Sequence, residues 1–420
     1  MRDMRESGVT WIGEIPTDWS LIRFKDKYTN IKEVAKERSV EFERLALTLN
    51  GVIKRPKDDS EGLQPKEFDG YQILRENDFV FKMIDLQNIS TSRVGLSPYT
   101  GLVSPAYIRF SPKEPNQYNQ FVYYYLMSMY YNCVYNNLGG NGVRSALNGR
   151  DMGEFVIPYP SESEQREISA FLDKKCNQVN ALIENVQAQI EKLRAYRQSV
   201  ITEVVIKGLD PTVPMKDSGV EWIGEIPAAW DTVRVKQLLR ERKERSAEGK
   251  EEPLSMSQKV GLVPTKTLDA IPNPASSYVG AKLAFVNDLV FNKLKAHLGV
   301  FSVSKYDGLV SPDYAVYYST GVVDLKYLEY LFKTPQCISE FRKRSTGIAA
   351  GLTRLYTDGL FAIECPLPPK DEQQAIVAYL DGKWAQIDRL IAIKQAKIEK
   401  LEQYKKSLIY EYVTGKREVL

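Results

Sequence analysis

The chain has 420 residues, of which 43% are hydrophobic and 26% charged, and its net charge is +3. This length fits two or three domains, and the composition excludes a disordered chain, a collagen-like fibre and a polytopic membrane protein. The sequence holds no run of about 18 apolar residues and no C-x-x-C pair among its four cysteines, and its first residues lack the apolar stretch expected of a secretory signal. These features predict a cytoplasmic protein with reduced thiols and no membrane association. Because the net charge is small, any binding of nucleic acid must depend on local basic clusters.

The sequence repeats itself at close to half its length. Trp-Ile-Gly-Glu-Ile-Pro at 11–16, followed by Trp19, returns at 222–227, followed by Trp230. Two further motifs return in the same order, at 101–107 and 308–314 and at 164–168 and 372–376. A period near 208 residues is far above that of a solenoid, so each copy is a domain-sized unit.

Within each copy, the first 150 or so residues predict a mixed α+β domain. Short β-like runs such as 78–81 and 107–110 alternate with Pro and Gly turns. The segment 118–135, and its partner from Leu325 onward, are apolar and aromatic at helical spacing. Aromatic side chains on such helices could stack on bases, but burial of the aromatic face in the domain core is the favoured interpretation.

A long helix is predicted after the Pro-rich segments at 158–160 and 366–369. Apolar residues then recur in steps of three and four over about four heptads, which is typical of a coiled coil. We call this stripe the apolar seam, and its predicted members are Val179, Ile183, Ile190, Leu193, Ile387, Ile391, Ile398 and Leu401. A helix packed only on its own domain is the alternative. We favour an antiparallel coiled coil of the two helices, because two similar copies on one chain can then be related by a pseudo-two-fold axis.

The predicted organisation therefore has four parts. Residues 1–160 and 208–368 form two similar domains, and residues 161–207 and 369–420 form the helices that follow them.

Motifs of catalysis are missing from the sequence. A single histidine, His297, cannot supply a zinc motif or a convincing Ser-His-Asp triad, and no phosphate-binding glycine loop is present. Asp313, Asp324 and Lys326 imitate the spacing of a metal-dependent nuclease, but the first copy has Ala106 in place of the leading acid. The sequence therefore predicts a non-catalytic protein with no cofactor and no metal site.

Basic residues gather at places that partly recur between the copies, and several flank glycine-rich segments. Arginine suits guanine edges and phosphates, whereas lysine acts mostly as a point charge on phosphate. A merely solvated surface is the alternative for any one of them, since 57 basic residues face 54 acidic ones. The candidate DNA-binding residues are Lys54, Arg55, Lys57, Lys82, Arg144, Arg150, Lys293, Lys295, Arg342, Lys343, Arg344 and Arg354.

The repeated motifs resemble those of a known family. Trp-Ile-Gly-Glu-Ile-Pro-x-x-Trp at the start of each copy, Gly-Leu-Val-Ser-Pro-x-Tyr in mid-domain and Glu-Gln at the start of each long helix are similar to the specificity (S) subunits of type I restriction-modification systems. The resemblance covers essentially the whole chain. It implies two target recognition domains that each read half of an asymmetric, bipartite site in double-stranded DNA. It further implies two conserved spacer helices that dock two modification (methyltransferase) subunits, with restriction (translocase/nuclease) subunits as further partners where the system has them.

The same resemblance implies that the specificity subunit has no enzymatic activity of its own. Two rival interpretations stay open at this point. A recognition half fused to a methyltransferase-nuclease is disfavoured because the sequence holds no catalytic domain. A two-domain protein-interaction scaffold without DNA specificity would share the repeat and the helices but would lack salt-dependent DNA binding.

Overall fold

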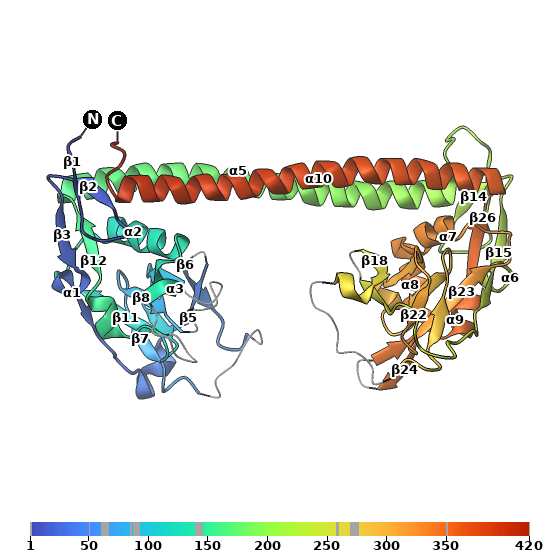
Figure 1. Ribbon diagram of the computed structural model, residues 1–420, viewed down its shortest axis with the longest axis horizontal. Coiled ribbons are helices and arrows are strands. Elements are labelled where there is room, and N and C mark those ends of the chain that lie inside the picture. Colours follow the sequence, from blue (N-terminus) through green and yellow to red (C-terminus); the bar gives the residue numbers. More distant parts are fainter. Residues whose placement is uncertain are drawn as a thin grey trace. The chain divides into compact units, whose positions relative to one another are not determined.

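The computed structural model describes residues 2–49, 51–59, 67–84, 86, 93–138, 146–257, 260–268, 277–349 and 352–419. The chain divides into two compact units (Figure 1). Unit 1 consists of Met1–Gln187 and Gln395–Leu420, and unit 2 consists of Ala188–Lys394. Each unit therefore combines a β-rich region with segments of both long helices, α5 (Glu162–Lys207) and α10 (Lys370–Val413).

Unit 1 is built from short strands and helices in its β-rich region. The strands are β1 (Met4–Glu6), β2 (Glu14–Pro16), β3 (Ser20–Arg23), β4 (Tyr28–Asn30), β5 (Arg44–Thr48), β6 (Gly51–Arg55), β7 (Gln72–Leu74), β8 (Phe79–Lys82), β9 (Arg93–Leu96), β10 (Gly101–Val103), β11 (Ile108–Pro112) and β12 (Val156–Tyr159). The helices are α1 (Phe24–Lys27), a 3-10 helix (Lys36–Glu41), α2 (Gln120–Tyr131), α3 (Val134–Leu138) and α4 (Gly149–Gly153).

Unit 2 follows nearly the same order of elements. Its strands are β13 (Met215–Asp217), β14 (Glu225–Pro227), β15 (Asp231–Arg234), β16 (Leu239–Glu241), β17 (Leu254–Ser257), β18 (Gly261–Pro264), β19 (Lys282–Ala284), β20 (Leu289–Asn292), β21 (Phe301–Val303), β22 (Gly308–Val310), β23 (Tyr314–Ser319), β24 (Thr346–Ala349), β25 (Leu352–Arg354) and β26 (Glu364–Leu367). Its helices are α6 (Val235–Leu238), α7 (Leu325–Phe332), α8 (Pro335–Arg344), α9 (Thr357–Phe361) and two 3-10 turns (Thr265–Thr267, Ala296–Leu298).

The sheets of the two units correspond to one another. The four-stranded sheet β4-β11-β8-β9 of unit 1 has the same strand order as β16-β23-β20-β21 of unit 2. The antiparallel pair β12-β3 likewise matches β15-β26, and β1-β2 matches β13-β14. The mixed α+β fold and the internal repeat predicted from the sequence are therefore present in the structure.

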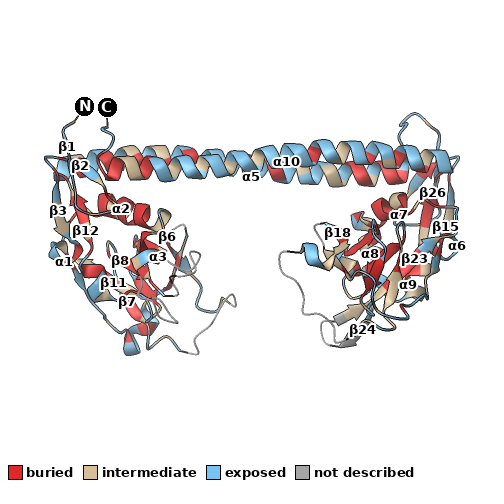
Figure 2. Cartoon of the chain, in the orientation of Figure 1, coloured by how far each residue is buried: buried red, intermediate tan, exposed pale blue. Residues whose placement is uncertain are grey.

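Buried residues gather inside each β-rich region (Figure 2). The central strands β8 and β20 are buried on both faces. Phe79 and Phe81 point into the main aromatic core of unit 1, whereas Val80 between them packs in a smaller cluster on the opposite face of the sheet. A strand that is buried on both faces has an uninterrupted run of apolar residues, as the sequence has at 79–81. The same arrangement recurs in unit 2 with Phe291 and Val290.

The aromatic helix segments lie in the cores of the units. Phe121 and Tyr125 of α2 and Leu328 of α7 are almost fully buried, which confirms the packing interpretation over base stacking. The helix expected over 118–135 is not continuous, because it ends at Tyr131 and α3 begins at Val134. Cys133 between them has a φ of +56°, in the left-handed region that interrupts a right-handed helix.

The repeated tryptophan motif joins the start of each β-rich region to the start of a long helix. The buried indole of Trp19 donates from Nε1 to Oε2 of Glu164 at 3.0 Å, and Trp230 donates to Glu372 at 2.8 Å. Both acids lie in the first turn of their helices, where carboxylates also interact favourably with the helix dipole.

Each core is completed by the far end of the other copy's helix. Leu408, Ile409, Tyr412 and Val413 of α10 belong to the core of unit 1. The corresponding part of α5, from Val200 to Ile206, belongs to the core of unit 2. Neither β-rich region is therefore covered by its own helix alone.

The long helices pack together and run antiparallel (Figure 1). In unit 1, Lys405 Nζ donates to Asn180 Oδ1 at 2.9 Å. In unit 2, Lys394 Nζ lies 2.5 Å from Gln189 Oε1, and Arg197 Nη1 lies 2.8 Å from Asp388 Oδ1. Residue numbers rise along α5 as they fall along α10, which fixes the antiparallel direction. Within the described part of the chain, no helix is long and apolar enough to cross a membrane.

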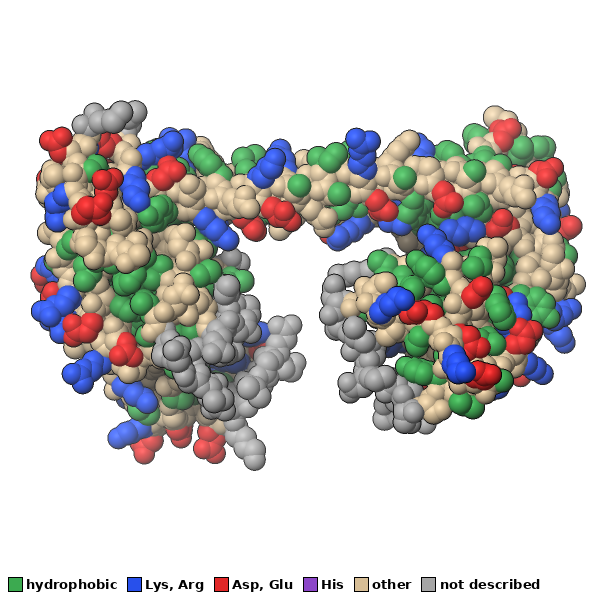
Figure 3. Space-filling view, viewed as in Figure 1, with side chains coloured by type: hydrophobic (Ala, Val, Ile, Leu, Met, Phe, Trp, Pro, Cys, Tyr) green, Lys and Arg blue, Asp and Glu red, His purple; other side chains and the backbone are tan. Residues whose placement is uncertain are grey.

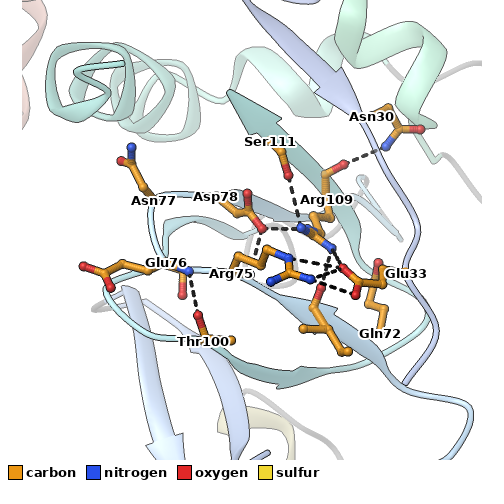
Figure 4. Close-up of polar contacts among 12 residues, drawn as sticks. Asn30, Glu33, Gln72, Arg75, Glu76, Asn77, Asp78, Thr100, Arg109 and Ser111 are labelled. Carbon is orange, nitrogen blue, oxygen red and sulfur yellow. Dashed lines mark hydrogen bonds and ion pairs between the residues drawn. The ribbon is translucent and has the colours of Figure 1, made fainter. Parts of the chain in front are cut away.

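A buried aspartate anchors the turn before each central strand (Figure 4). Asp78 Oδ2 accepts from the backbone N–H of Arg75 at 2.7 Å and from Arg109 Nε at 2.6 Å. The Arg109 guanidinium, buried to 98%, also donates to the Ile73 carbonyl at 2.6 Å and to Glu33 at 3.3 Å. Burial opposes ionisation of Glu33, but hydrogen bonds from Arg75 and Arg109 prevail and hold its pKa below the usual value.

In unit 2, the equivalent buried aspartate is paired with an arginine from a different segment. Asp288 Oδ2 accepts from the backbone N–H of Phe285 at 2.8 Å and from Arg242 Nε at 2.6 Å. Arg242 follows β16, whereas Arg109 belongs to β11. The repeat therefore keeps the buried carboxylate and its turn but changes the source of the cation.

Candidate nucleic-acid interface

The basic residues at the β5–β6 hairpin of unit 1 are held by local partners. Lys54 Nζ lies 2.5 Å from Glu43 Oε2, and Arg55 Nε lies 2.5 Å from Asp59 Oδ2. Lys57 Nζ donates to the backbone carbonyl of Ser39 at 2.8 Å. A cation paired with a nearby carboxylate adds little net positive potential to the surface, so Lys54 and Arg55 are weaker candidates than their sequence suggests. Figure 3 shows the same mixing of Lys and Arg with Asp and Glu over the visible face.

Two other candidates of unit 1 lie on segments that meet. The chain leaving β8 after Lys82 forms an isolated bridge between Ile84 and Ala146, and the Leu147 N–H donates to the Met83 carbonyl at 3.2 Å. Arg150 follows on the exposed surface of α4. The structure thus brings the segments of Lys82 and Arg150 together, while Arg144 lies outside the described residues.

The two corresponding segments also meet in unit 2, where more basic residues lie close together. The Leu355 N–H donates to the Lys293 carbonyl at 3.0 Å, which places Lys293 beside the end of the β24–β25 hairpin at Arg354. Lys295 is exposed two residues further along. Arg354 Nη2 pairs with Asp313 Oδ1 at 2.8 Å.

Two further cations, Lys282 and Arg245, lie near Lys293 and were not predicted from the sequence. Lys282 Nζ donates to the Tyr314 carbonyl at 2.6 Å. Burial lowers the pKa of Lys282, and Lys293 and Arg245 lower it further against the opposite effect of Glu241 and Asp313. Arg245 also pairs with Lys282 in an isolated β-bridge, which brings their backbones together. Aligning the two copies could have found Lys282, because Gln72 holds the same place in unit 1 and donates to the corresponding carbonyl of Tyr107 at 2.7 Å.

The run Arg342, Lys343 and Arg344 forms the exposed last turn of α8. Lys343 Nζ lies 2.8 Å and Arg344 Nη2 lies 3.3 Å from carboxylate oxygens of Glu340. Along the chain, this run comes just before the β24–β25 hairpin, which ends at Arg354. Cations at a helix C-terminus also interact favourably with its dipole, so part of their role is structural.

The residues that imitate a nuclease have structural partners. Asp313 is paired with Arg354, and Asp324 caps α7 by accepting from the N–H groups of Lys326 and Tyr327. Lys326 Nζ lies 2.9 Å from Glu329. Across the described ranges, no group of three or more His, Cys, Asp or Glu side chains could hold a metal ion.

The burial of the residues in the predicted apolar seam varies along the helix pair. Val179, Ile190 and Ile387 are buried. The remaining members are partly buried: Ile183, Leu193, Ile391, Ile398 and Leu401. The three polar cross-helix contacts interrupt the seam, so the pair is held by mixed apolar and polar contacts.

Comparison with known proteins gives a consistent result over the whole chain. Residues 27–192 match the family described as type I restriction modification DNA specificity domain. The chain is similar to the type I restriction enzyme MjaVIII specificity subunit of Methanocaldococcus jannaschii, with 23% identity over 96% of this chain and 93% of that protein. It is also similar to the EcoDI specificity subunit of Escherichia coli, with 20% identity over 90% of this chain and 84% of the other.

Among solved structures, the fold matches a chain from work on complex assembly and conformational transition of the type I R-M system. The TM-score is 0.61 at 16% identity, covering 95% of this chain and 98% of that one. The two β-rich regions and the paired long helices agree with this match. Residues 27–192 thus match a type I restriction modification DNA specificity domain, and the chain over nearly its whole length is similar to the specificity subunits of type I restriction enzymes.

Proposed function

We propose that the chain recognises an asymmetric, bipartite site in double-stranded DNA, with residues 1–160 and 208–368 each reading one half-site. The proposal rests on one observation. The two β-rich regions share a backbone arrangement but present different side chains at equivalent positions. Gln72 and Lys282 occupy the same place and donate to equivalent carbonyls, yet one is neutral and the other cationic. Two domains that share a backbone arrangement but differ in the groups they present should read different sequences.

Within this proposal, the cation cluster of unit 2 contacts the phosphates of its half-site. The cluster consists of Lys282, Lys293 and Arg245, which come from three different segments, so a single substitution should leave the others in place. In unit 1 the segments of Lys82 and Arg150 form the corresponding candidate surface.

The salt dependence of DNA binding tests this proposal. Lys282→Gln, which introduces the residue of unit 1, should weaken binding to all sequences and make the salt slope shallower by about 1. Lys216→Gln, on the exposed strand β13 of a separate two-stranded sheet, is the matched control and should change neither quantity. Binding by the wild type that does not depend on salt would contradict the proposal and favour the interaction scaffold.

Exchange of one recognition domain tests the bipartite site. Replacing residues 1–160 by the corresponding domain of another family member should change one half of the methylated motif in cells that also carry the modification subunit. A change in both halves would contradict the assignment of one half-site to each domain.

We further propose that the helices 161–207 and 369–420 dock two modification subunits, with restriction subunits as additional partners in the cytoplasm. Exposed apolar residues support this, because they recur in both units. Leu182 and Leu390 are 48% and 46% exposed, and Tyr196 and Tyr404 are 52% and 50% exposed. The register set by Lys405 and Asn180 places Leu182 near Tyr404 in unit 1.

The corresponding register in unit 2 places Leu390 near Tyr196. Each unit therefore presents one leucine–tyrosine pair across its two helical segments, and repeated exposed apolar pairs are typical of interaction surfaces. Leu182→Glu with Tyr404→Glu should remove one bound modification subunit, measured by mass of the purified complex. The control Glu184→Gln should retain both subunits, and a double variant that still binds two would contradict the docking proposal.

A further inference from the structure

Unit 1 contains a cavity of about 580 Å³ between α2 and the adjoining segments of α5 and α10. Tyr123, Tyr124 and Tyr131 line it from α2, Cys176 from α5 and Lys405 from α10. We call it the aromatic cavity. Its volume lies in the range of small-molecule sites, about 300–1,000 Å³. Among the described residues, none of the candidate DNA-binding cations lines it, and it is not part of the proposed recognition of DNA.

The internal repeat shows which side chain fills the corresponding place in unit 2. Tyr124 donates to Asp173 at 2.5 Å, and Tyr330 donates to Asp381, so these pairs align the two units. The aspartates, which both lie on the long helices, are offset by 208 residues, and the same offset equates Cys176 with Trp384. A small thiol in unit 1 therefore stands where unit 2 has an indole.

The indole in unit 2 is held between two flat groups. The Trp384 ring centroid lies 4.9 Å from that of Tyr330, and the Arg197 guanidinium lies 4.3 Å from the Trp384 ring. Arg197 is fixed in turn by Asp388 at 2.8 Å. Cation–π contact and ring packing both favour this arrangement.

Unit 1 retains the groups that would hold such a ring. Tyr124 corresponds to Tyr330, and Lys405 corresponds to Arg197. Lys405 is fixed by Asn180 at 2.9 Å, just as Arg197 is fixed by Asp388. The cation, its polar anchor and the tyrosine are thus all present around the smaller side chain of Cys176.

The cavity wall also offers polar partners for a heteroaromatic ring. Glu184 and Glu402 line it and can accept a hydrogen bond from a ring N–H. Burial raises the pKa of Tyr123 to about 12 and that of Tyr131 above its usual range, so both phenols stay protonated at neutral pH. A protonated phenol can donate as well as accept a hydrogen bond.

We propose that the aromatic cavity of unit 1 is a binding site for one planar heteroaromatic molecule of indole size, held between Tyr124 and Lys405. The ring occupies the place that Trp384 takes in unit 2, and its N–H faces the carboxylates of Glu184 and Glu402.

Titration of the full-length chain with indole tests the proposal. Met127 lines the cavity and provides a local probe when the methionine methyl groups are labelled with ¹³C. The ring current of bound indole should shift the Met127 resonance saturably, with one equivalent bound by calorimetry. The exposed Met215 on β13 should not shift. A wild-type chain whose Met127 signal does not respond would overturn the proposal.

Two substitutions at Cys176 separate filling of the cavity from other effects. Cys176→Trp supplies the ring from within, so indole should no longer bind, whereas Cys176→Ser keeps the cavity and should bind as the wild type does. Binding of indole by Cys176→Trp at wild-type strength would overturn the proposal.

The complementary variant opens the equivalent place in unit 2. Trp384→Ala should bind a second equivalent of indole, because it removes the ring and leaves Tyr330 and Arg197. A stoichiometry that stays at one would overturn the assignment of the site to an indole-sized ring.

Discussion

Replacing Arg109 by methionine should destabilise unit 1 by about 3–5 kcal/mol, because it removes one partner of a buried ion pair. Arg109 and Asp78 have side chains that are only 2% and 3% exposed, and their atoms Nε and Oδ2 lie 2.6 Å apart. The methionine would leave the Asp78 carboxylate without its counter-charge in a site that water cannot reach. The Ile73 carbonyl would also lose its hydrogen bond from the guanidinium.

Native-state hydrogen exchange measures this loss in the correct part of the chain, since a protein of two units need not unfold in one step. Amides of β8 and β11 should exchange on the order of a hundred- to several-thousand-fold faster in Arg109→Met. Amides of β20 and β23 in unit 2 serve as the internal reference.

A matched surface variant shows what burial contributes. Arg75 also contacts Glu33, at 2.9 Å, but its side chain is 52% exposed. Arg75→Met should therefore cost at most about 1 kcal/mol. Arg109→Met combined with Asp78→Asn should be less destabilised than Arg109→Met alone, because no uncompensated charge remains. If Arg109→Met cost no more than Arg75→Met, the buried pair would not hold unit 1 together and the reasoning would be refuted.

Three further predictions concern single side chains of unit 1. Trp19→Phe should lower stability by about 1.5–3 kcal/mol, since it removes a hydrogen bond to the charged Glu164, and denaturant unfolding followed by circular dichroism measures the change. The folded pKa of Glu33 is lowered from 4.5, so its stabilising contribution is present above that value and is lost as the pH falls through the folded pKa; Glu33→Gln should flatten the acid limb of a stability–pH profile. Burial raises the pKa of Cys176 to about 11, so iodoacetamide should label the partly exposed Cys133 of the native chain before Cys176, as read by peptide mass spectrometry.

The repeat and the long helices could be predicted from the sequence because both are patterns within one or two segments. The period near 208 residues and the spacing of Val179 and Ile190 are visible in the letters alone. The break in the aromatic helix at Cys133 could not be predicted, because the residue types around it do not indicate that this cysteine adopts a left-handed φ.

The candidate site was predicted less well, because ion pairing joins residues that are distant in sequence. Lys54 is basic in the sequence but is paired with Glu43, which immediately precedes the neighbouring strand β5. Lys282 is an isolated lysine in the sequence, and only the pairing of β19 with β22 and the approach of Lys293 place it in a cluster. The assignment of the cations to bases or phosphates stays a prediction.

The completion of each core by the opposite helix has a consequence for folding during synthesis. Unit 2 is one contiguous stretch, Ala188–Lys394, so all its core residues have been translated once Lys394 has emerged from the ribosome. Unit 1 begins first but lacks Leu408, Ile409, Tyr412 and Val413 until α10 is finished. An N-terminal domain usually folds first during synthesis. Here the core of unit 2 can be completed before that of unit 1. Until then Phe171, which packs against Tyr412 at 4.5 Å between ring centroids, stays uncovered and is a natural contact for a chaperone.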